Sequence, residues 1–100
     1  MGLFGGKKNN NTVKITDYYS EKELKLIRDT VEPKVQANAY GSIGQLVGKG
    51  LIDYMNRPEK EYSYNKMNSF MKIANSMKDC EPSIAEVLQN GIDKYRANPK

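Results

Sequence analysis

Three short segments of the form Ser-x-x-Glu or Ser-x-x-Gln occur along the chain, beginning at Ser20, Ser42 and Ser83. In such a capping box the serine hydroxyl accepts a hydrogen bond from the amide three residues on, and that residue's side chain reaches back to the serine amide. Apolar residues recur at helical spacing after each box, and another apolar stripe lies between the second box and the third. The sequence therefore predicts a mainly α-helical chain with about four helices.

Each predicted helix has an apolar stripe that we assign to the core. Members of a stripe are three or four residues apart, which places them on one side of a helix. The first stripe is Leu24, Ile27 and Val31, and Pro33 predicts a boundary or a kink at the end of that helix. The other stripes are Ile43, Leu46, Val47, Gly50, Leu51, Tyr54 and Met55; then Met67, Phe70, Met71, Ala74 and Met77; and finally Ile84, Val87, Leu88, Gly91, Ile92 and Tyr95. The methionines are assigned to the core rather than to a partner groove.

The second predicted helix contains Gly44, Gly48 and Gly50. Each glycine costs roughly 1 kcal/mol relative to alanine inside a helix. We therefore expect another part of the backbone to approach this helix closely.

The chain has 100 residues, of which 38% are hydrophobic, so it forms one small domain with a thin core that dimerisation would enlarge. It has no histidine and a single cysteine, Cys80, which excludes histidine-dependent catalysis and an intramolecular disulfide. The glycine-rich segment 41–50 matches neither the phosphate-loop nor the dinucleotide-binding pattern. We expect a cytoplasmic protein that is not an enzyme, with no cofactor, no metal site and no membrane-spanning segment.

Sixteen basic and 12 acidic residues give a net charge of +4, which favours a polyanionic partner. Residues 1–16 contain Lys7, Lys8 and Lys14 and no acidic residue. The segment 5–11 consists of Gly, Lys and Asn and has no apolar anchor. We interpret residues 1–11 as a flexible basic arm.

The segment Thr12–Tyr19 is rich in β-branched and aromatic residues, which predicts a short N-terminal strand. Strand alternation places Lys14, Thr16 and Tyr18 on one face, and Val13, Ile15 and Tyr19 on the other. Asp17 has the same parity as this second face.

A strand followed by two capped helices over residues 12–56 resembles the ribbon-helix-helix family of Arc/MetJ-type DNA-binding proteins. The resemblance implies that two chains pair their strands as an antiparallel ribbon, which enters the major groove with Lys14, Thr16 and Tyr18 facing the bases. It also implies that Ser42 meets a phosphate at the start of the second helix. We add Gly41, Lys49 and the arm residues Lys7 and Lys8 as expected phosphate contacts.

This interpretation divides the chain into the arm (1–11), a ribbon-helix-helix-like DNA-binding core (12–58) and a C-terminal helical extension (59–100) available to a protein partner. The expected function is sequence-specific binding of double-stranded DNA as a homodimer. By resemblance, such proteins act as transcriptional repressors or as accessory factors in plasmid partition or conjugation. The Lys- and Asn-rich composition is typical of AT-rich bacterial, plasmid or phage sources.

Two alternatives stay open. Residues 20–56 also fit a plain or winged helix-turn-helix, with the second capped helix reading the bases and residues 62–64 forming part of a wing. The other alternative is a helical adaptor of a phage or immunity type, which binds a protein through a Met/Tyr surface and has no affinity for nucleic acid. Replacing Lys14 and Thr16 separates the ribbon from the helix-turn-helix, because only the ribbon uses them to contact bases.

Overall fold

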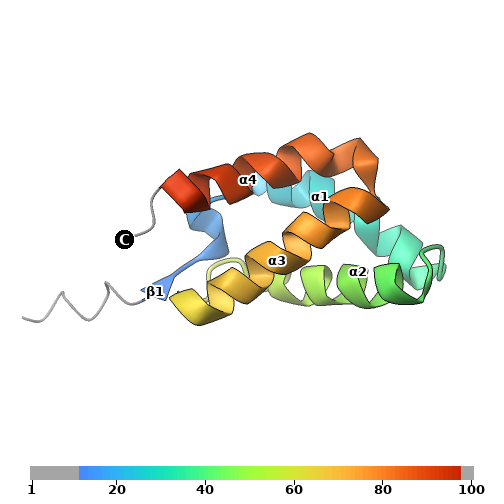
Figure 1. Cartoon of the computed structure of the whole chain (residues 1–100), viewed down its shortest axis with the longest axis horizontal. Helices are drawn as coiled ribbons and strands as arrows, with labels where there is room; N and C mark the ends of the chain where they lie inside the picture. Colours follow the sequence, from blue (N-terminus) through green and yellow to red (C-terminus); the bar gives the residue numbers. More distant parts are fainter. Residues whose placement is uncertain (1–11, 98–100) are drawn as a thin grey trace, which may run out of the picture.

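Four helices follow one another along residues 12–97, which are the part of the chain that the computed structural model describes (Figure 1). This confirms the prediction of a mainly helical fold. The helices are α1 (Glu21–Gln36), α2 (Ser42–Met55), α3 (Tyr64–Cys80) and α4 (Ala85–Ala97). Two 3₁₀ turns, η2 (Ile15–Asp17) and η3 (Pro82–Ile84), and two short strands, β1 (Thr12–Val13) and β2 (Tyr62–Ser63), complete the described part.

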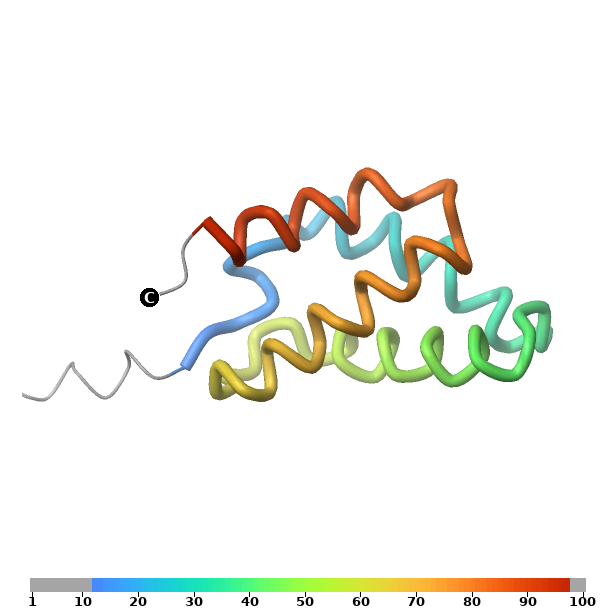
Figure 2. The backbone as a smooth tube through the Cα atoms, in the orientation of Figure 1, coloured from blue at the N-terminus to red at the C-terminus, as the bar shows by residue number. Residues whose placement is uncertain are grey.

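Helix α3 lies between α2 and α4 (Figure 2). It packs against both, while α1 packs mainly against α2. One hydrophobic core extends from Val13 to Ile92 and takes side chains from all four helices. The predicted boundary at residue 58 therefore does not separate a core from an extension, since α3 and α4 supply a large part of that core. None of the helices in the described range has the length and apolar character needed to cross a bilayer.

Helix α1 begins as its capping box predicts. The Ser20 hydroxyl accepts a hydrogen bond from the Glu23 amide, and the Glu23 carboxylate accepts one from the Ser20 amide. The helix does not stop before Pro33, so the predicted boundary there is wrong. Pro33 lies in the last turn, where its missing N–H removes one helical hydrogen bond, and its carbonyl still accepts from the Ala37 amide at 3.0 Å.

The other two predicted capping boxes are wrong. The N-cap of α2 is Gly41, which has no side chain to cap the helix, and Gln45 donates instead to the Val35 carbonyl. Ser83 lies in η3, before α4 begins, and its hydroxyl donates to the Glu81 carboxylate. In both places the polar side chain finds a partner in another part of the fold, which a local pattern does not reveal.

The predicted strand over Thr12–Tyr19 is also wrong beyond its first two residues. Strand β1 pairs antiparallel with β2 of the same chain, so that Thr12 faces Ser63 and Val13 faces Tyr62. The strand ends because the Asp17 carboxylate accepts a hydrogen bond from the Lys14 amide at 2.8 Å and closes the η2 turn. This turn is the reason why Asp17 does not occupy the core.

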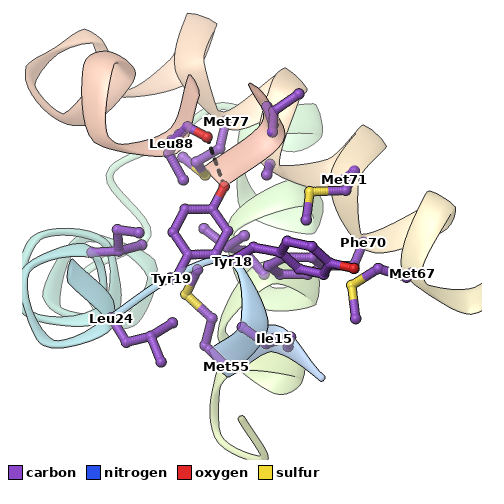
Figure 3. Close-up of a cluster of buried hydrophobic side chains, with 14 of the residues drawn as sticks. Ile15, Tyr18, Tyr19, Leu24, Met55, Met67, Phe70, Met71, Met77 and Leu88 are labelled. Carbon is purple, nitrogen blue, oxygen red and sulfur yellow. Dashed lines mark hydrogen bonds between the residues drawn. The ribbon is translucent and has the colours of Figure 1, made fainter. Parts of the chain in front are cut away.

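The turn also destroys the strand parity, so Tyr18 and Tyr19 are both buried (Figure 3). The Tyr19 hydroxyl donates to the Leu88 carbonyl at 2.6 Å, and its ring packs edge-on against Phe70. Gly91 makes room for this ring, because a Cβ at that position would lie 2.1 Å from it. Tyr18 packs edge-on against Tyr95 at a centroid distance of 5.2 Å.

Helices α3 and α4 direct their predicted stripes inward. The stripe of α3 is buried from Met67 to Met77, so the assignment of its methionines to the core is confirmed. In α4, Leu88, Gly91 and Ile92 are buried. Cys80 is half-buried at the last position of α3.

Helix α2 is rotated relative to its predicted stripe. Its buried residues are Gly44, Gly48, Leu51, Ile52 and Met55, whereas Ile43 and Leu46 point outward. Side chains rather than backbone approach the buried glycines: a Cβ would lie 2.9 Å from Tyr40 at Gly44 and 2.7 Å from Val35 at Gly48. Helix α2 therefore has a buried face of small and large apolar residues and a second apolar face without a partner in the described chain.

Candidate nucleic-acid interface

Helix α3 presents a polar outer face opposite its buried stripe. The helix begins at Ser63, whose hydroxyl accepts a hydrogen bond from the Lys66 amide at 3.2 Å. The exposed residues that lie opposite the stripe share hydrogen-bonding side chains without negative charge. We define the α3 polar face as Asn65, Asn68, Ser69, Lys72, Asn75 and Ser76. The first acidic residue of the helix is Asp79, near its C-terminal end, so this face has no carboxylate over four turns.

A hollow of about 590 Å³ lies between α3 and α4, along one side of the α3 polar face. Lys72, Asn75 and Ser76 line it from α3, and Arg96 lines it from α4. Within residues 12–97 neither Lys72 nor Arg96 has an acidic partner at ion-pair distance. The hollow therefore combines two unneutralised cations with amide and hydroxyl groups, which suits an anionic ligand.

The Tyr95 side chain shapes the same hollow. Its hydroxyl bonds to the Asn68 side chain and lies 3.4 Å from the Tyr64 carbonyl. The hydroxyl donates to the Asn68 side-chain oxygen, and burial raises the pKa of Tyr95 above its ordinary value. The orientation of Asn68 is thus fixed from α4.

A second hollow, of about 480 Å³, lies on the other flank of α3, beside the C-terminal end of α2. Three cations, Arg57, Lys60 and Lys66, line it together with the carboxylate of Asp53. The Lys60 ammonium group lies over the Tyr62 ring, 5.5 Å from its centre, in a cation–π contact. Cationic side chains therefore flank α3 on its α2 side as well as on its α4 side.

The structure does not bring the predicted base contacts together on one face. The Lys14 ammonium lies 4.0 Å from the Glu59 carboxylate, and the Thr16 amide donates to the Pro58 carbonyl at 3.3 Å. Tyr18 is buried, so the prediction that it shares an outward face with Lys14 and Thr16 is wrong. Lys7 and Lys8 lie outside the described residues.

The predicted phosphate contacts are exposed: Ser42 and Lys49 belong to α2, and Gly41 is its N-cap. Gly41 and Ser42 stand at its N-terminal end, whereas Lys14 lies beside Glu59, beyond its C-terminal end. The length of α2 separates Gly41 and Ser42 from that end by about 20 Å, and Lys49 lies midway along the helix. As a reader of bases, α2 has an unsuitable outer face, since Ile43 and Leu46 occupy it.

One carboxylate, that of Glu81, is buried in the described part of the chain, directly after the C-terminal end of α3. Glu81 is 5% exposed and accepts hydrogen bonds from Lys34, Tyr40 and Ser83. The Lys34 ammonium and the Ser83 hydroxyl hold the pKa of Glu81 at about 2, against an opposing effect of burial. With both carboxylate oxygens bonded, Glu81 fixes α1, the α1–α2 loop and η3 to one another. Among residues 12–97 there is no cluster of three residues able to hold a metal ion.

Comparisons with protein-family models, with curated proteins and with solved structures found no match for this chain. The ribbon-helix-helix resemblance therefore stays a prediction. Sequence reasoning missed the α3 polar face because it carries no motif. The nearest signal was the absence of Asp and Glu from Tyr64 to Lys78, and it does not single out α3, because residues 33–52 contain no acidic residue either.

Proposed function

We propose that this protein binds double-stranded DNA through the α3 polar face. The observation that carries the proposal is a helix whose outer side has hydrogen-bonding side chains and no carboxylate, flanked on both sides by hollows lined with cations. A net charge of +4 favours the same class of partner. The proposal keeps the function expected from the sequence and moves it to a different surface.

The chemistry of the face suits the major groove. That groove is about 12 Å wide and admits an α-helix, and its base edges offer donors and acceptors to side chains. Asn is suited to adenine, Lys to guanine and Ser to either, so Asn68, Lys72 and Asn75 are the proposed base-reading residues. A helix in the groove has one phosphate strand on each side.

The flanking cations suit those two strands. Arg96 on the α4 side, and Arg57, Lys60 and Lys66 on the α2 side, are the proposed phosphate contacts. Contacts of this kind position the protein on the duplex, whereas base contacts specify the sequence. The carboxylate of Asp53 at the edge of the second hollow repels phosphate, so we expect the α4 side to contribute more.

The experiment measures binding to a labelled duplex by fluorescence anisotropy as the salt concentration rises. Affinity is expected to fall by orders of magnitude between about 50 and 200 mM salt, because phosphate contacts release counterions. Replacing Lys72 and Arg96 together by alanine is expected to weaken binding about tenfold or more and to reduce the slope against log salt by about two. The matched control removes Lys25 and Arg28, two cations of α1, and is expected to change affinity by less than about threefold.

The ribbon hypothesis and the adaptor hypothesis predict different outcomes of this experiment. If two chains pair their strands as a ribbon and contact the bases with Lys14 and Thr16, replacing these two residues by alanine abolishes specific binding, and the α3 variant retains it. If the protein is an adaptor without affinity for nucleic acid, no duplex binding is measured even at the lowest salt. Either result contradicts the α3 interface.

A further inference from the structure

The outer side of α2 exposes two large apolar residues to solvent. Ile43 and Leu46 are 76% and 73% exposed, the highest values among the large hydrophobic residues of the described chain. They lie about one turn apart on the same side of the helix, so they form one small apolar patch. Residues 12–97 leave this patch uncovered, and its burial in an interface is favourable in proportion to the apolar area removed from water.

The surroundings of the patch are positive along α2. Lys49 follows Leu46 by about one turn on the same side and is exposed. It has no acidic partner at ion-pair distance in the described part of the chain. The sequence contains no Asp or Glu from residue 33 to residue 52, so no carboxylate offsets either Lys49 or the positive end of the helix dipole.

The C-terminal end of the same side leads into the second hollow. Asp53 lies one turn after Lys49 and lines this hollow together with three cations, Arg57, Lys60 and Lys66. None of these three cations has an ion pair within residues 12–97. One carboxylate against three cations leaves the hollow with a net positive charge. The apolar patch therefore has positive charge at both of its ends.

We propose that the outer side of α2 docks an acidic amphipathic helix of another protein. The docking surface consists of the apolar patch, Lys49, and the three cations of the second hollow. Two apolar residues of the partner, one turn apart, cover Ile43 and Leu46, and Asp or Glu residues on either side of them face the positive ends. Residues 43 and 57 are about 20 Å apart along α2, which corresponds to about four turns of the partner helix.

Charge and shape favour this occupant over two others. A second copy of this chain would place one positive face against another, which opposes pairing through α2. An anionic membrane has the required charge, but its surface is planar, whereas three of the four cations line a hollow. Acidic side chains that project from a helix are able to enter that hollow.

The test measures binding of a labelled synthetic peptide to the full chain by fluorescence anisotropy, without DNA. The peptide is an alanine-based helix of about 20 residues, with two central leucines one turn apart and two glutamates toward each end. Its dissociation constant is expected to be about 100 μM or lower and to rise with salt. One control peptide has lysine for glutamate, and the other has alanine for leucine. Each is expected to bind about tenfold more weakly or less, and equal binding of all three, or none, overturns the proposal.

Two variants of the apolar patch test its location. Leu46→Asp is expected to weaken peptide binding about tenfold or more. Leu26→Asp is the matched control, because Leu26 is 45% exposed on α1 and lies outside the docking surface. Ile43→Asp places an acidic residue in the first turn of α2, which favours the helix, so it is expected to weaken binding while thermal stability is retained. A Leu46→Asp variant that binds the peptide as well as Leu26→Asp contradicts the docking surface.

A charge reversal tests the complementarity. Lys49→Glu is expected to weaken binding of the glutamate peptide and to strengthen binding of the lysine peptide, and both effects are expected to diminish at high salt. An unchanged preference between the two peptides overturns the role of charge.

Two further measurements separate the other partners. If the protein sediments with vesicles of phosphatidylcholine and phosphatidylserine, loses this affinity in Leu46→Asp, and does not bind the peptide, the surface belongs to a membrane and the proposal is wrong. Since Arg57, Lys60 and Lys66 are also proposed phosphate contacts, a duplex is expected to compete with the peptide. The peptide measurement itself contains no DNA, so its outcome is independent of the proposed function.

Discussion

The outer sides of α2 and α3 differ as much as their inner sides agree. Both helices bury apolar side chains in the same core, and both contribute fully enclosed residues such as Leu51 and Phe70. Outside, α2 exposes Ile43 and Leu46, whereas α3 exposes asparagine, serine and lysine. Packing in the core explains the residues on the inner sides of both helices, and it does not explain the residues on their outer sides.

The difference separates two kinds of partner. An apolar face is suited to a protein surface, since its burial is driven by the hydrophobic effect. A face of neutral donors and acceptors beside unpaired cations is suited to a polyanion, since it loses little when its side chains exchange water for base edges and phosphate. The outer sides of the two adjacent helices therefore suit different kinds of partner.

The largest expected effect is on the free energy of unfolding, and it compares a substitution on the inner side of α3 with one on its outer side. Phe70→Ala removes a fully buried ring and is expected to lower the free energy of unfolding by about 3–5 kcal/mol, measured by urea denaturation. Lys72→Ala on the same helix is expected to change it by less than about 0.5 kcal/mol. A loss of the same size at both positions contradicts the assignment of Lys72 to a free surface.

A second prediction concerns the buried carboxylate that joins the far ends of the helices. The folded-state pKa of Glu81 is lowered from 4.5 to about 2, so its contribution is present above pH 4.5 and is lost as the pH falls toward 2. Glu81→Gln is expected to reduce the unfolding free energy at pH 7 by about 1–3 kcal/mol. Thermal melts of both proteins between pH 7 and pH 2 are expected to converge at the acid end. Parallel melting curves across this range are the contrary result.

A smaller effect on stability distinguishes the two sides of α2, when a glycine on each side is replaced by alanine. Gly48→Ala places a Cβ 2.7 Å from Val35 and is expected to destabilise the fold by about 1 kcal/mol or more. Gly50→Ala meets only the Ile73 side chain and is expected to stabilise the monomer by up to about 1 kcal/mol. Differential scanning calorimetry at low protein concentration measures both, and equal signs contradict the division of α2 into an inner and an outer side.

The smallest effect concerns α1, whose outer side carries mixed charges. The Lys25 ammonium lies 2.9 Å from the Asp29 carboxylate, and both side chains are exposed. Lys25→Ala is expected to lower the unfolding free energy by at most about 0.5 kcal/mol, and less in high salt. Urea denaturation at two salt concentrations checks this, and a loss above 1 kcal/mol contradicts it.

Local patterns predicted what local interactions determine. The box at Ser20 and the stripe from Met67 to Met77 are both present. The predictions failed where a distant residue competes for the same group, as Val35 does for Gln45 and Glu81 does for Ser83.

The rotation of α2 has a comparable cause. Its sequence holds two apolar stripes, and only the packing of Val35 and Tyr40 against the glycines determines which one is buried. The strand prediction failed at Asp17, whose side chain closes a turn that alternation does not anticipate. The sequence did not predict the candidate interface on α3, because this face has no motif and is characterised only by the absence of acidic residues.

The most direct test of the proposed DNA interface is a nuclear magnetic resonance titration of the isotopically labelled protein with a short duplex. We predict that the backbone amides of α3 and the side-chain amides of Asn65, Asn68 and Asn75 shift first, with Arg96 following. The amides of residues 12–18 and of α1 are expected to keep their positions. Shifts confined to residues 12–18, or spread evenly over α1 and α3, would contradict the account.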